Sequence, residues 1–479
     1  MSTFTPFEEK MESAGISTAA IKAFSRCYEA LVSNHSGMIP ETDISPAAQV
    51  ADWTNITDST APAGKDLISQ CVCIKLNGGL GTSMGLQKAK SLLKVKGEDT
   101  FLDLIVRQVK HLRTVSGTPV RLLLMNSFST SADTLAYLEK YAADGFADAH
   151  QVELMQNRVP KILADTLEPA SYPQQPELEW CPPGHGDLYP ALLGSGWLDR
   201  LLEDGVKYAF ISNSDNLGAQ LDMNFLRWFA ESGAPFVMEV TRRTEADKKG
   251  GHLAVRKSDG HLILREVAQC PDADIPEFQN ISKHRYFNTN TLWIRLDSLK
   301  QILDANGGVL PLPMIRNSKT VNPRDPESAK VFQLETAMGA GIECFPGAPA
   351  DCHSRLSPAC GARHHHALSS RPLVGHAGHG PGPGRPLPVS GAPLPEACGR
   401  HRHASGRGNS PLCASAPHHA VAPLAADMLR RAGRNAADAP PGGRNKRRHR
   451  NGSPDGVQPG HAGPCRSGAP QLPASLRLW

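Results

Sequence analysis

Apolar and polar positions follow two different periods along the first 348 residues of the chain. Apolar side chains recur at helical spacing through residues 6–33, and a polar connector covers about residues 34–65. Short, nearly continuous apolar runs then alternate with amphipathic segments, which predicts parallel strands covered by helices on both faces of a sheet. The predicted strands are 67–79, 120–128, 151–157 and 207–216, and the predicted helices are 100–113, 131–142 with Ser131 as N-cap, and 189–202.

Three more apolar segments follow, at residues 234–243, 251–267 and 286–296. The middle segment contains Asp259-Gly260 between two apolar runs, which predicts a β-hairpin that turns at these two residues. We expect this hairpin to form an antiparallel insertion beside the parallel sheet. The predicted fold class is therefore α/β, a Rossmann-like nucleotide-binding domain with a mixed sheet.

The composition changes abruptly soon after Phe345. Between Asp351 and Trp479 there is no Phe, Tyr, Ile or Thr, and Lys446 is the only lysine. A segment of this kind cannot bury enough apolar area to offset its ordering entropy, so we expect a disordered tail. A basic RNA-binding tail and a metal-binding tract at His364–His366 are two interpretations. The composition favours a third, a GC-rich coding sequence translated in the wrong frame.

Charge and cysteine content narrow the range of partners. The formal net charge is +4, no run of eighteen apolar residues exists, and Met1–Lys10 lacks the pattern of a signal peptide. We expect a soluble cytoplasmic protein without a nucleic-acid or membrane partner. The chain has 11 cysteines, and we interpret Cys71 and Cys73 as two buried strand thiols, in preference to a metal site.

Residues 75–91 read KLNGGLGTSMGLQKAKS and follow the first predicted strand of the sheet. Ligands of open parallel sheets bind beyond the carboxyl ends of the strands, and glycine lets backbone N–H groups approach phosphate oxygens or a base. The spacing of Gly79, Gly81 and Gly85 matches neither common nucleotide-binding template. A plain tight turn is the simpler interpretation, but Lys88 and Lys90 just downstream favour a triphosphate.

This loop closely resembles the signature loop of the eukaryotic-type UTP–glucose-1-phosphate uridylyltransferases. The resemblance continues in the family's order from about residue 70 to residue 348. The blocks that carry it are FLDLIVRQV, LMNSF, PPGHGDLY, ISNSDNLGA, VMEV, KKGGHL, FNTNTLWI and QLETAMGA.

The resemblance implies that UTP and glucose 1-phosphate give UDP-glucose and diphosphate, with in-line attack on the α-phosphorus and Mg²⁺ as cofactor. It makes Lys90 the catalytic lysine that meets the triphosphate and Asp215 the ligand of Mg²⁺. Gln156 matches the glutamine that contacts the uracil edge. The implied substrate-binding residues are Leu76, Asn77, Gly78, Gly79, Gln156, Gly184, His185, Asn213, Ser214, Lys249, Asn288, Asn290 and Glu335.

Taken alone, each residue has a simpler interpretation. Lys90 would be a solvated surface lysine, Asp215 would cap the strand in an Asx-turn, and Gln156 would be a polar strand end.

We predict an N-terminal helical region at 1–55, a nucleotidyltransferase catalytic domain at 56–348 and an aberrant tail at 349–479. In the family, a further phosphate-binding lysine and a C-terminal β-helix with oligomer contacts follow the catalytic blocks. The tail matches neither, so we expect the β-helix to be absent and the protein to be a monomer or a weak dimer.

Other functions stay open at this point. The chain is also compatible with a uridylyltransferase for another sugar 1-phosphate, or with a protein that binds UTP or UDP-glucose without turnover. A hydride-transferring dinucleotide enzyme is disfavoured, because no acidic residue stands about 20 residues past the loop within a clear strand.

Overall fold

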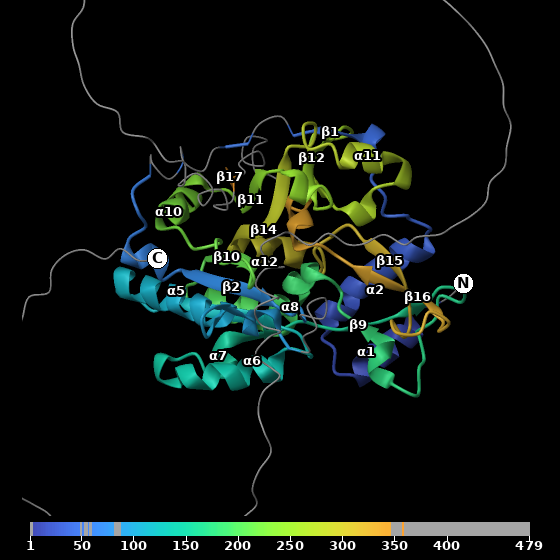
Figure 1. The fold of residues 1–479 in the computed structure, drawn as a ribbon, viewed down its shortest axis with the longest axis horizontal. Coiled ribbons are helices and arrows are strands. Elements are labelled where there is room, and N and C mark those ends of the chain that lie inside the picture. Colours follow the sequence, from blue (N-terminus) through green and yellow to red (C-terminus); the bar gives the residue numbers. More distant parts are fainter. Residues whose placement is uncertain are drawn as a thin grey trace, which may run out of the picture. The chain divides into compact units, whose positions relative to one another are not determined.

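A mixed sheet of ten strands organises the protein (Figure 1). The computed structural model describes residues 3–47, 50–51, 56, 60–80, 88–345 and 357–358, all within the first of two units, Met1–Leu387. Gly81 and Gly85 of the glycine loop, and nearly all of the tail at 349–479, lie outside the described residues.

Four parallel strands form one half of the sheet, in the order β10–β2–β5–β6. In register, Leu76 of β2 lies opposite Met125 of β5 and Asn213 of β10, so the carboxyl ends of these strands meet at one edge. Their bounds are β2 Cys71–Asn77, β5 Arg121–Asn126, β6 Glu153–Met155 and β10 Tyr208–Asn213. The predicted parallel strands are confirmed, and each strand is shorter than the segment predicted for it.

Antiparallel strands form the other half of the sheet. The strand β14 pairs with β11 along one side, and on its other side it pairs with β12 at Phe287 and with β10 further along, while β1 adds to β12. The predicted hairpin is confirmed as β12 and β13, but β12 hydrogen-bonds into the main sheet, so the hairpin continues the sheet rather than standing beside it. The bounds are β1 Ile44–Pro46, β11 Phe236–Arg242, β12 His252–Arg256, β13 Leu262–Arg265, β14 Tyr286–Arg295 and β17 Ser357–Pro358, which pairs with β11.

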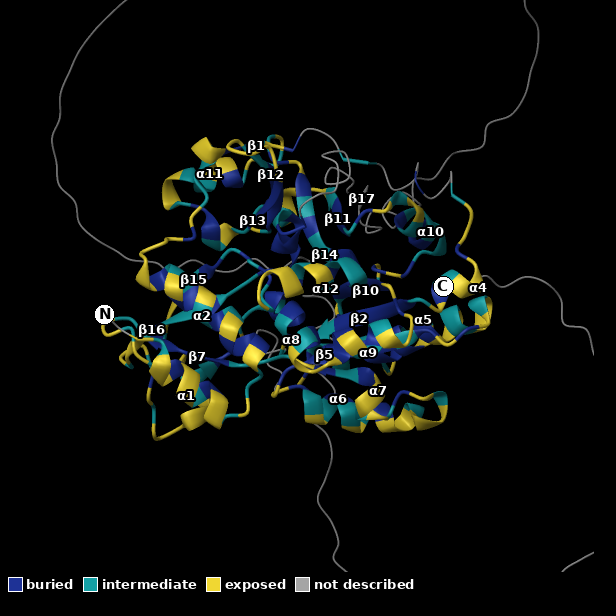
Figure 2. Ribbon diagram, turned by 180° about the vertical axis from the view of Figure 1, so that it is seen from behind, coloured by how far each residue is buried: buried dark blue, intermediate teal, exposed yellow. Residues whose placement is uncertain are grey.

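Helices cover both faces of the parallel half, as the apolar strands require (Figure 2). Val72 and Ile74 of β2 pack in one core with α8, α9 and α12, whereas Cys71 and Cys73 pack in the other with α5 and α10. Both thiols are buried and free, as predicted. The helices are α5 Phe101–Ser116, α6 Ser131–Leu138, α7 Ala149–Val152, α8 Leu188–Gly194, α9 Trp197–Glu203, α10 Met223–Ser232 and α12 Leu296–Ala305.

Two helix predictions need correction. The N-cap of α6 is Thr130, whose side chain makes no capping hydrogen bond, and Ser131 is the first helical residue, with its hydroxyl donating to the Glu153 carboxylate instead of capping the helix. The predicted helix 189–202 is two helices, interrupted at Ser195 and Gly196, where Gly196 has a φ of +77°. A left-handed residue ends an α-helix, and glycine adopts that conformation without a steric penalty.

The N-terminal region is helical, as the spacing of residues 6–33 predicts, and it consists of two helices, α1 Thr5–Ser13 and α2 Thr18–Val32. Phe7, Phe24 and Tyr28 form an aromatic cluster that packs on a small sheet with the order β15–β16–β8. The other short elements are β3 Lys94–Lys96, β4 Asp99–Thr100, β7 Val159–Pro160, β8 Ile162–Leu163, β9 Trp180–Cys181, β15 Ile315–Thr320, β16 Lys330–Glu335, α4 Lys65–Ile68 and α11 Ile275–Phe278.

Single 3₁₀ turns complete the described secondary structure. They are η1 Glu41–Asp43, η3 Lys90–Leu92, η4 Glu139–Asp144, η5 Pro176–Glu179, η6 His185–Asp187, η7 Glu245–Asp247, η8 Val267–Gln269, η9 Asp272–Asp274 and η10 Met338–Glu343.

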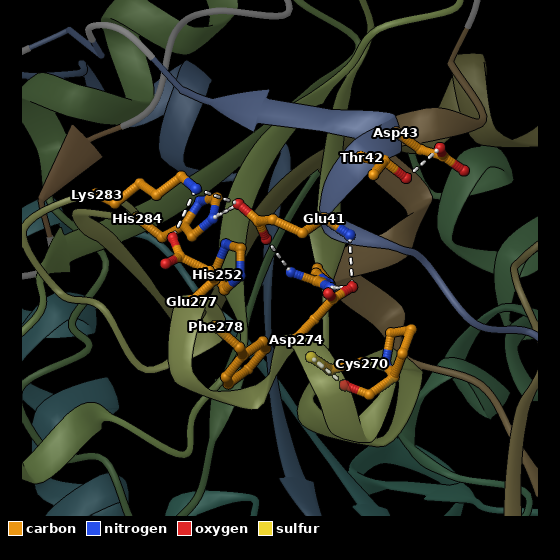
Figure 3. Close-up of polar contacts among 12 residues, drawn as sticks. Glu41, Thr42, Asp43, His252, Cys270, Asp274, Glu277, Phe278, Lys283 and His284 are labelled. Atoms are coloured by element: carbon orange, nitrogen blue, oxygen red, sulfur yellow. Dashed lines mark hydrogen bonds and ion pairs between the residues drawn. The ribbon is translucent and has the colours of Figure 1, made fainter.

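A cluster of charged side chains ties the connector before β1 to the antiparallel half of the sheet (Figure 3). The Glu41 carboxylate accepts hydrogen bonds from fully buried Arg265 at 2.6 Å and from His284 Nε2 at 2.9 Å. Burial raises the pKa of Glu41, but hydrogen bonds from Lys283, His284 and Arg265 outweigh it and hold the pKa at about 2. Glu41 is therefore ionised across the neutral range.

Two imidazoles stack beneath this carboxylate. The rings of His252 and His284 lie 4.0 Å apart between centroids, and the Nε2 of His252 has no hydrogen-bond partner in the described structure. Burial, together with the charges of His284, Arg243 and Arg265, lowers the pKa of His252 to about 3. Burial also lowers the pKa of His284, although Glu41 opposes this effect. Both rings are neutral at neutral pH.

We predict that the His252 ring makes the fold sensitive to acid. Its folded pKa lies below its unfolded value, so its contribution to stability is complete above about pH 6.5 and is lost as the pH falls, by about 1.4 kcal/mol per pH unit. His252→Phe keeps a ring in the stack. When the pH falls from about 7 to about 5.5, the unfolding free energy of this variant should therefore decrease by about 1 kcal/mol less than that of the parent. The measurement is urea denaturation at each pH, with the exposed His111→Phe as control. An acid loss that is equal in both variants would contradict it.

Candidate functional site

A cavity of about 320 Å³ opens where the parallel strands end. Leu76, Met125 and Asn213 lie at the carboxyl ends of β2, β5 and β10 and reach its wall together. The sequence-predicted residues that line the cavity are Leu76, Gly78, Gly79, Lys90, Gln156, Gly184, His185, Asn213, Ser214, Asp215 and Glu335.

The two ends of the glycine loop are fastened at the cavity wall. The hydroxyl of Ser127, just past β5, donates to the carbonyl of Gly78 at 2.9 Å, and the N–H of Lys90 donates to the carbonyl of Gly79 at 3.1 Å. Leu80 and Ala89 form a β-bridge between the outgoing and returning chain. Lys90 is thereby brought back to the cavity, whereas Lys88 is exposed and does not line it.

Gln156 spans the cavity wall between two glycines. Its Nε2 donates to the carbonyl of Gly184 at 3.0 Å, and its own N–H donates to the carbonyl of Asn126 at 2.7 Å. A Cβ on Gly78 would lie 2.4 Å from the Gln156 Oε1, so a side chain at position 78 would displace the amide from this place. The geometry fixes the amide orientation and presents Oε1 as an acceptor.

The loop at Gly184 approaches the end of β16 backbone to backbone. Gly184 has φ +79° and ψ 175°, a combination essentially confined to glycine, and a Cβ there would lie 2.5 Å from the carbonyl oxygen of Thr336. The N–H of Thr336 donates to the carbonyl of Pro183, and the N–H of Gly186 donates to the carbonyl of Thr336. This contact holds Glu335 and His185 at the same wall.

His185 is a neutral hydrogen-bond donor. Its Nδ1 accepts the N–H of Met338 at 3.0 Å, which leaves the ring proton on Nε2. Burial lowers the pKa of His185 to about 4, so the ring carries no charge at neutral pH. The side chain can therefore donate to an oxygen atom without changing the charge of the cavity.

Lys90 and Asp215 provide opposite charges at the cavity. The Lys90 Nζ lies 3.7 Å from the Asp215 Oδ2, and the side chains are 38% and 41% exposed, respectively. A pair this exposed is screened by solvent and contributes little to stability, so both groups are available to a ligand. Among the described hydrogen bonds, the Asx-type contact of this loop is made by Asn216, which accepts from the N–H of Gly218. Asp215 does not have the capping role that its simpler interpretation predicts.

The donor set suits a metal that a ligand helps to hold. In the part of the chain that the structure describes, no group of three or more His, Cys, Asp or Glu side chains is arranged around a metal position. Mg²⁺ is commonly held by one or two carboxylates together with substrate phosphates, and a half-exposed Asp215 beside the cavity fits that arrangement.

Four sequence-predicted residues do not line the cavity. Asn77 is buried beneath it and donates to the Asn126 Oδ1 at 2.7 Å and to the Thr134 hydroxyl at 3.0 Å. Asn288 donates to the Asn290 Oδ1 at 2.9 Å, and neither residue lines the cavity. Lys249 is exposed in the turn before β12.

Some residues of this region were not among the predicted site residues. Met125 and Pro182 line the cavity. Burial raises the pKa of Glu266, a change that a hydrogen bond from Asn288 opposes. A Cβ on Gly251 would lie 2.6 Å from the Glu266 carboxyl group, so the glycine pair that precedes β12 makes room for this acid. That glycine pair was the available clue.

Comparison with known proteins agrees with this geometry. The family model for UTP–glucose-1-phosphate uridylyltransferase matches residues 21–355. The Saccharomyces cerevisiae UTP–glucose-1-phosphate uridylyltransferase is 44% identical over 291 residues, which are 60% of this chain and 57% of the yeast protein. The Solanum tuberosum enzyme is 40% identical over 319 residues, with 63% and 64% covered. The chain thus spans about three-fifths of the length of the curated relatives it matches.

Solved structures give the same result. The Trypanosoma brucei UDP-glucose phosphorylase superposes with a TM-score of 0.69 at 47% identity and covers 74% of each chain. A mutant of the Leishmania major UDP-glucose pyrophosphorylase, solved in complex with UDP-glucose, superposes with a TM-score of 0.68 at 44% identity and covers 75% of each chain. The predicted α/β fold with a mixed sheet is confirmed by these likenesses.

We predict that Gly184→Ala destabilises the protein more than a glycine replacement of similar φ elsewhere. Gly260 has a φ of +73° with no atom within 4 Å of a new Cβ, so Gly260→Ala should cost about 1 kcal/mol of unfolding free energy. Gly184→Ala adds a clash with the Thr336 backbone and should cost about 1–3 kcal/mol more. Denaturant unfolding of both variants measures the difference. Equal losses would show that the approach of the two loops is not required.

Proposed function

Because the chain belongs to the UTP–glucose-1-phosphate uridylyltransferase family, we propose that it binds UTP and glucose 1-phosphate in this cavity and forms UDP-glucose and diphosphate. One observation carries the proposal. The backbone at Gly78 and Gly79, the Gln156 amide, Lys90 and Asp215 all line one cavity at the carboxyl edge of the parallel strands. Backbone donors, a cation and a carboxylate are the groups that nucleotidyl transfer needs around a triphosphate.

The uridine lies against Gln156. The amide is oriented by Gly184, and its Oε1 accepts from the N–H of a uracil edge while Gly78 leaves the approach clear. A cytosine presents no N–H at the equivalent ring position, so this acceptor favours uracil. Leu76, Gly78 and Gly79 provide apolar and backbone contacts on the same wall.

The phosphates lie between the glycine loop and Lys90. An oxygen of glucose 1-phosphate forms a new bond to the α-phosphorus of UTP, and the bond from that phosphorus to the β-phosphate breaks, so diphosphate leaves with the electron pair. Lys90 stabilises the charge on the phosphates, and neutral His185 donates a hydrogen bond from Nε2 without adding charge. Asp215 would hold Mg²⁺ together with the phosphate oxygens, and the bound ion would neutralise charge on the diphosphate.

The sugar phosphate lies beside Asn213 and Ser214, which follow β10 into the cavity. Glu335 contributes a carboxylate at the opposite wall, and burial raises its pKa. Asn288 and Asn290, with Glu266 behind them, are hydroxyl partners one layer further back. Lys249 reaches phosphates only if the turn before β12 moves toward the cavity.

A second candidate function is nucleotide binding without turnover. Residues 351–479 hold a single lysine, Lys446, and the family match ends at residue 355. We infer that the further phosphate-binding lysine expected from the family resemblance is missing here, in keeping with a shifted reading frame. The uracil-contacting part of the cavity does not depend on that lysine.

Release of diphosphate from UTP and glucose 1-phosphate separates the two candidates. UDP-glucose formation in step with diphosphate establishes the uridylyltransferase. Binding of UTP or UDP-glucose in calorimetry without any diphosphate establishes the binding protein. Parallel assays with CTP and with galactose 1-phosphate report the choice of base and of sugar. A chain that binds none of these nucleotides would refute both candidates. No helix in the described ranges is long and apolar enough to cross a bilayer.

We predict that Lys90→Ala weakens UTP binding. Loss of a charged hydrogen bond of this kind is worth about 1.5–3 kcal/mol, which corresponds to a dissociation constant about 10–100-fold higher. Turnover, where present, should fall about 100–1,000-fold. The exposed Lys96→Ala, outside the cavity, is the control for loss of one positive charge. If Lys90→Ala binds UTP within about threefold of the parent, Lys90 has no role at the phosphates.

We predict that Asp215→Asn reduces the effect of Mg²⁺ on UTP binding. The variant should bind UTP without metal at least as well as the parent, because one negative charge near the triphosphate is gone. The gain in affinity on adding Mg²⁺ should fall at least about tenfold, because an amide is a weaker ligand for a hard cation than a carboxylate. Titrations of UTP with excess Mg²⁺ and with excess chelator give both values. An unchanged Mg²⁺ effect would remove Asp215 from the metal site.

A further inference from the structure

Lys75 is a buried cation directly beneath the candidate site. It belongs to β2, its side chain is 3% exposed, and its Nζ donates to the Ser212 hydroxyl at 2.6 Å and to the Ala219 carbonyl at 2.8 Å. The ammonium also lies over the ring of Phe210, at 5.3 Å from the centroid.

No described carboxylate forms an ion pair with this ammonium. The acid that couples to it is Glu239 of β11, whose carboxyl accepts a hydrogen bond from the Trp293 indole at 2.7 Å. Burial raises the pKa of Glu239 to about 8, so this group is mainly protonated at neutral pH. The other groups that face the pair are the Cys73 thiol, whose pKa burial raises to about 11, and Asp222, which caps α10.

Lys75 is therefore left as an uncompensated charge. Burial lowers its pKa to about 8, so most molecules carry the ammonium at neutral pH. A buried cation without a carboxylate costs stability, and an anion bound nearby offsets that cost.

The contacts of Lys75 place this charge under the residues that meet the ligand. Ser212 and Ala219 stand at the two ends of the loop that carries Asn213, Ser214 and Asp215, so one ammonium holds both ends. The next residue in β2, Leu76, lines the cavity, and its carbonyl accepts the N–H of Ser214. The ammonium thus ties β2, β10 and the loop into one unit.

We propose that Lys75 is a positioning residue that fixes the loop 212–219 and supplies buried positive charge for an anionic nucleotide. The proposal rests on the uridine-nucleotide function proposed above and deepens it. A unit charge about 10 Å from a phosphate, at an effective dielectric constant of about 20, changes its binding about tenfold. An uncharged ligand of the same pocket gains nothing from this charge. Lys75 therefore acts on the phosphates rather than on the uridine.

The test compares a charged and an uncharged probe. UDP-glucose and uridine are titrated against the full chain and against Lys75→Met, which keeps the length and apolar stem of the side chain. We expect the dissociation constant of UDP-glucose to rise about tenfold or more and that of uridine to change less than about threefold. Lys161→Met is the matched control, because Lys161 is also 3% exposed and donates to a single carbonyl, that of Val321, outside the cavity. It should leave both ligands unaffected.

A second measurement needs no variant. In the parent protein, affinity for UDP-glucose should fall relative to that for uridine between about pH 7 and about pH 9, as the Lys75–Glu239 pair loses one proton. Titration of the uracil ring affects both probes equally and cancels in the ratio. In a folded Lys75→Met, this fall should be absent.

The outcomes are distinct. Equal weakening of both probes, or a pH-dependent ratio that persists in Lys75→Met, would overturn the role of the charge and leave Lys75 a structural residue. An unchanged UDP-glucose affinity in Lys75→Met would overturn the proposal entirely. If the parent binds neither probe, the proposed function itself fails. If the parent binds UDP-glucose and its affinity relative to that for uridine does not change with pH, the charge effect is refuted, even if Lys75→Met does not fold.

Discussion

The parallel pairing of β2 with β5 and β10 is the constraint on which the site depends. It sets Leu76 level with Met125 and Asn213, so three loops leave the sheet at the same height. The glycine loop after β2, the turn at Ser127 after β5 and the loop with Asp215 after β10 therefore begin close to one another. Ser127 holds Gly78 and Leu76 holds Ser214, and both contacts cross between neighbouring strands at this edge. A shift of register by one residue would turn every one of these groups to the opposite face.

Polar side chains beneath the cavity support that edge. Asn77 donates to Asn126, the Asn126 amide donates to Glu153 at 2.7 Å, and the Ser131 hydroxyl donates to the same Glu153 oxygen. These bonds link the ends of β2, β5 and β6 by side chains where the backbone ladder stops. Buried polar groups are costly unless they are paired, so such a network also specifies one arrangement of the strand ends. Asn77, although predicted to touch substrate, is therefore a structural part of the site.

The sequence predicts the parallel half well because each strand is a short apolar run that ends in a polar or glycine-rich turn. The residues at those strand ends, such as Gly78, Gln156 and Asp215, are brought together by topology alone, and the resemblance to a family adds their roles. Prediction fails where nonlocal contacts decide. The Ser131 hydroxyl does not cap α6 but donates to Glu153 of β6, and the position of Glu266 depends on the approach of Gly251.

The antiparallel half explains why the distal residues were placed less accurately. Between Glu239 and Val240 the pairing with β14 slips, since Glu239 lies opposite Thr291 and Val240 opposite Asn288. Thr289 and Asn290 are left out of register, and Asn290 takes a φ of +55° while the Thr289 hydroxyl donates to the Glu239 carbonyl. A bulge redirects side chains from the alternation of a regular strand. The run of residues 288–290 looks like an ordinary strand in sequence, so the sequence gives no sign of this bulge. The same irregularity lies beside Glu239, and the Glu239 carboxyl influences the pKa of Lys75 in β2, the strand that leads into the glycine loop, without an ion pair between them.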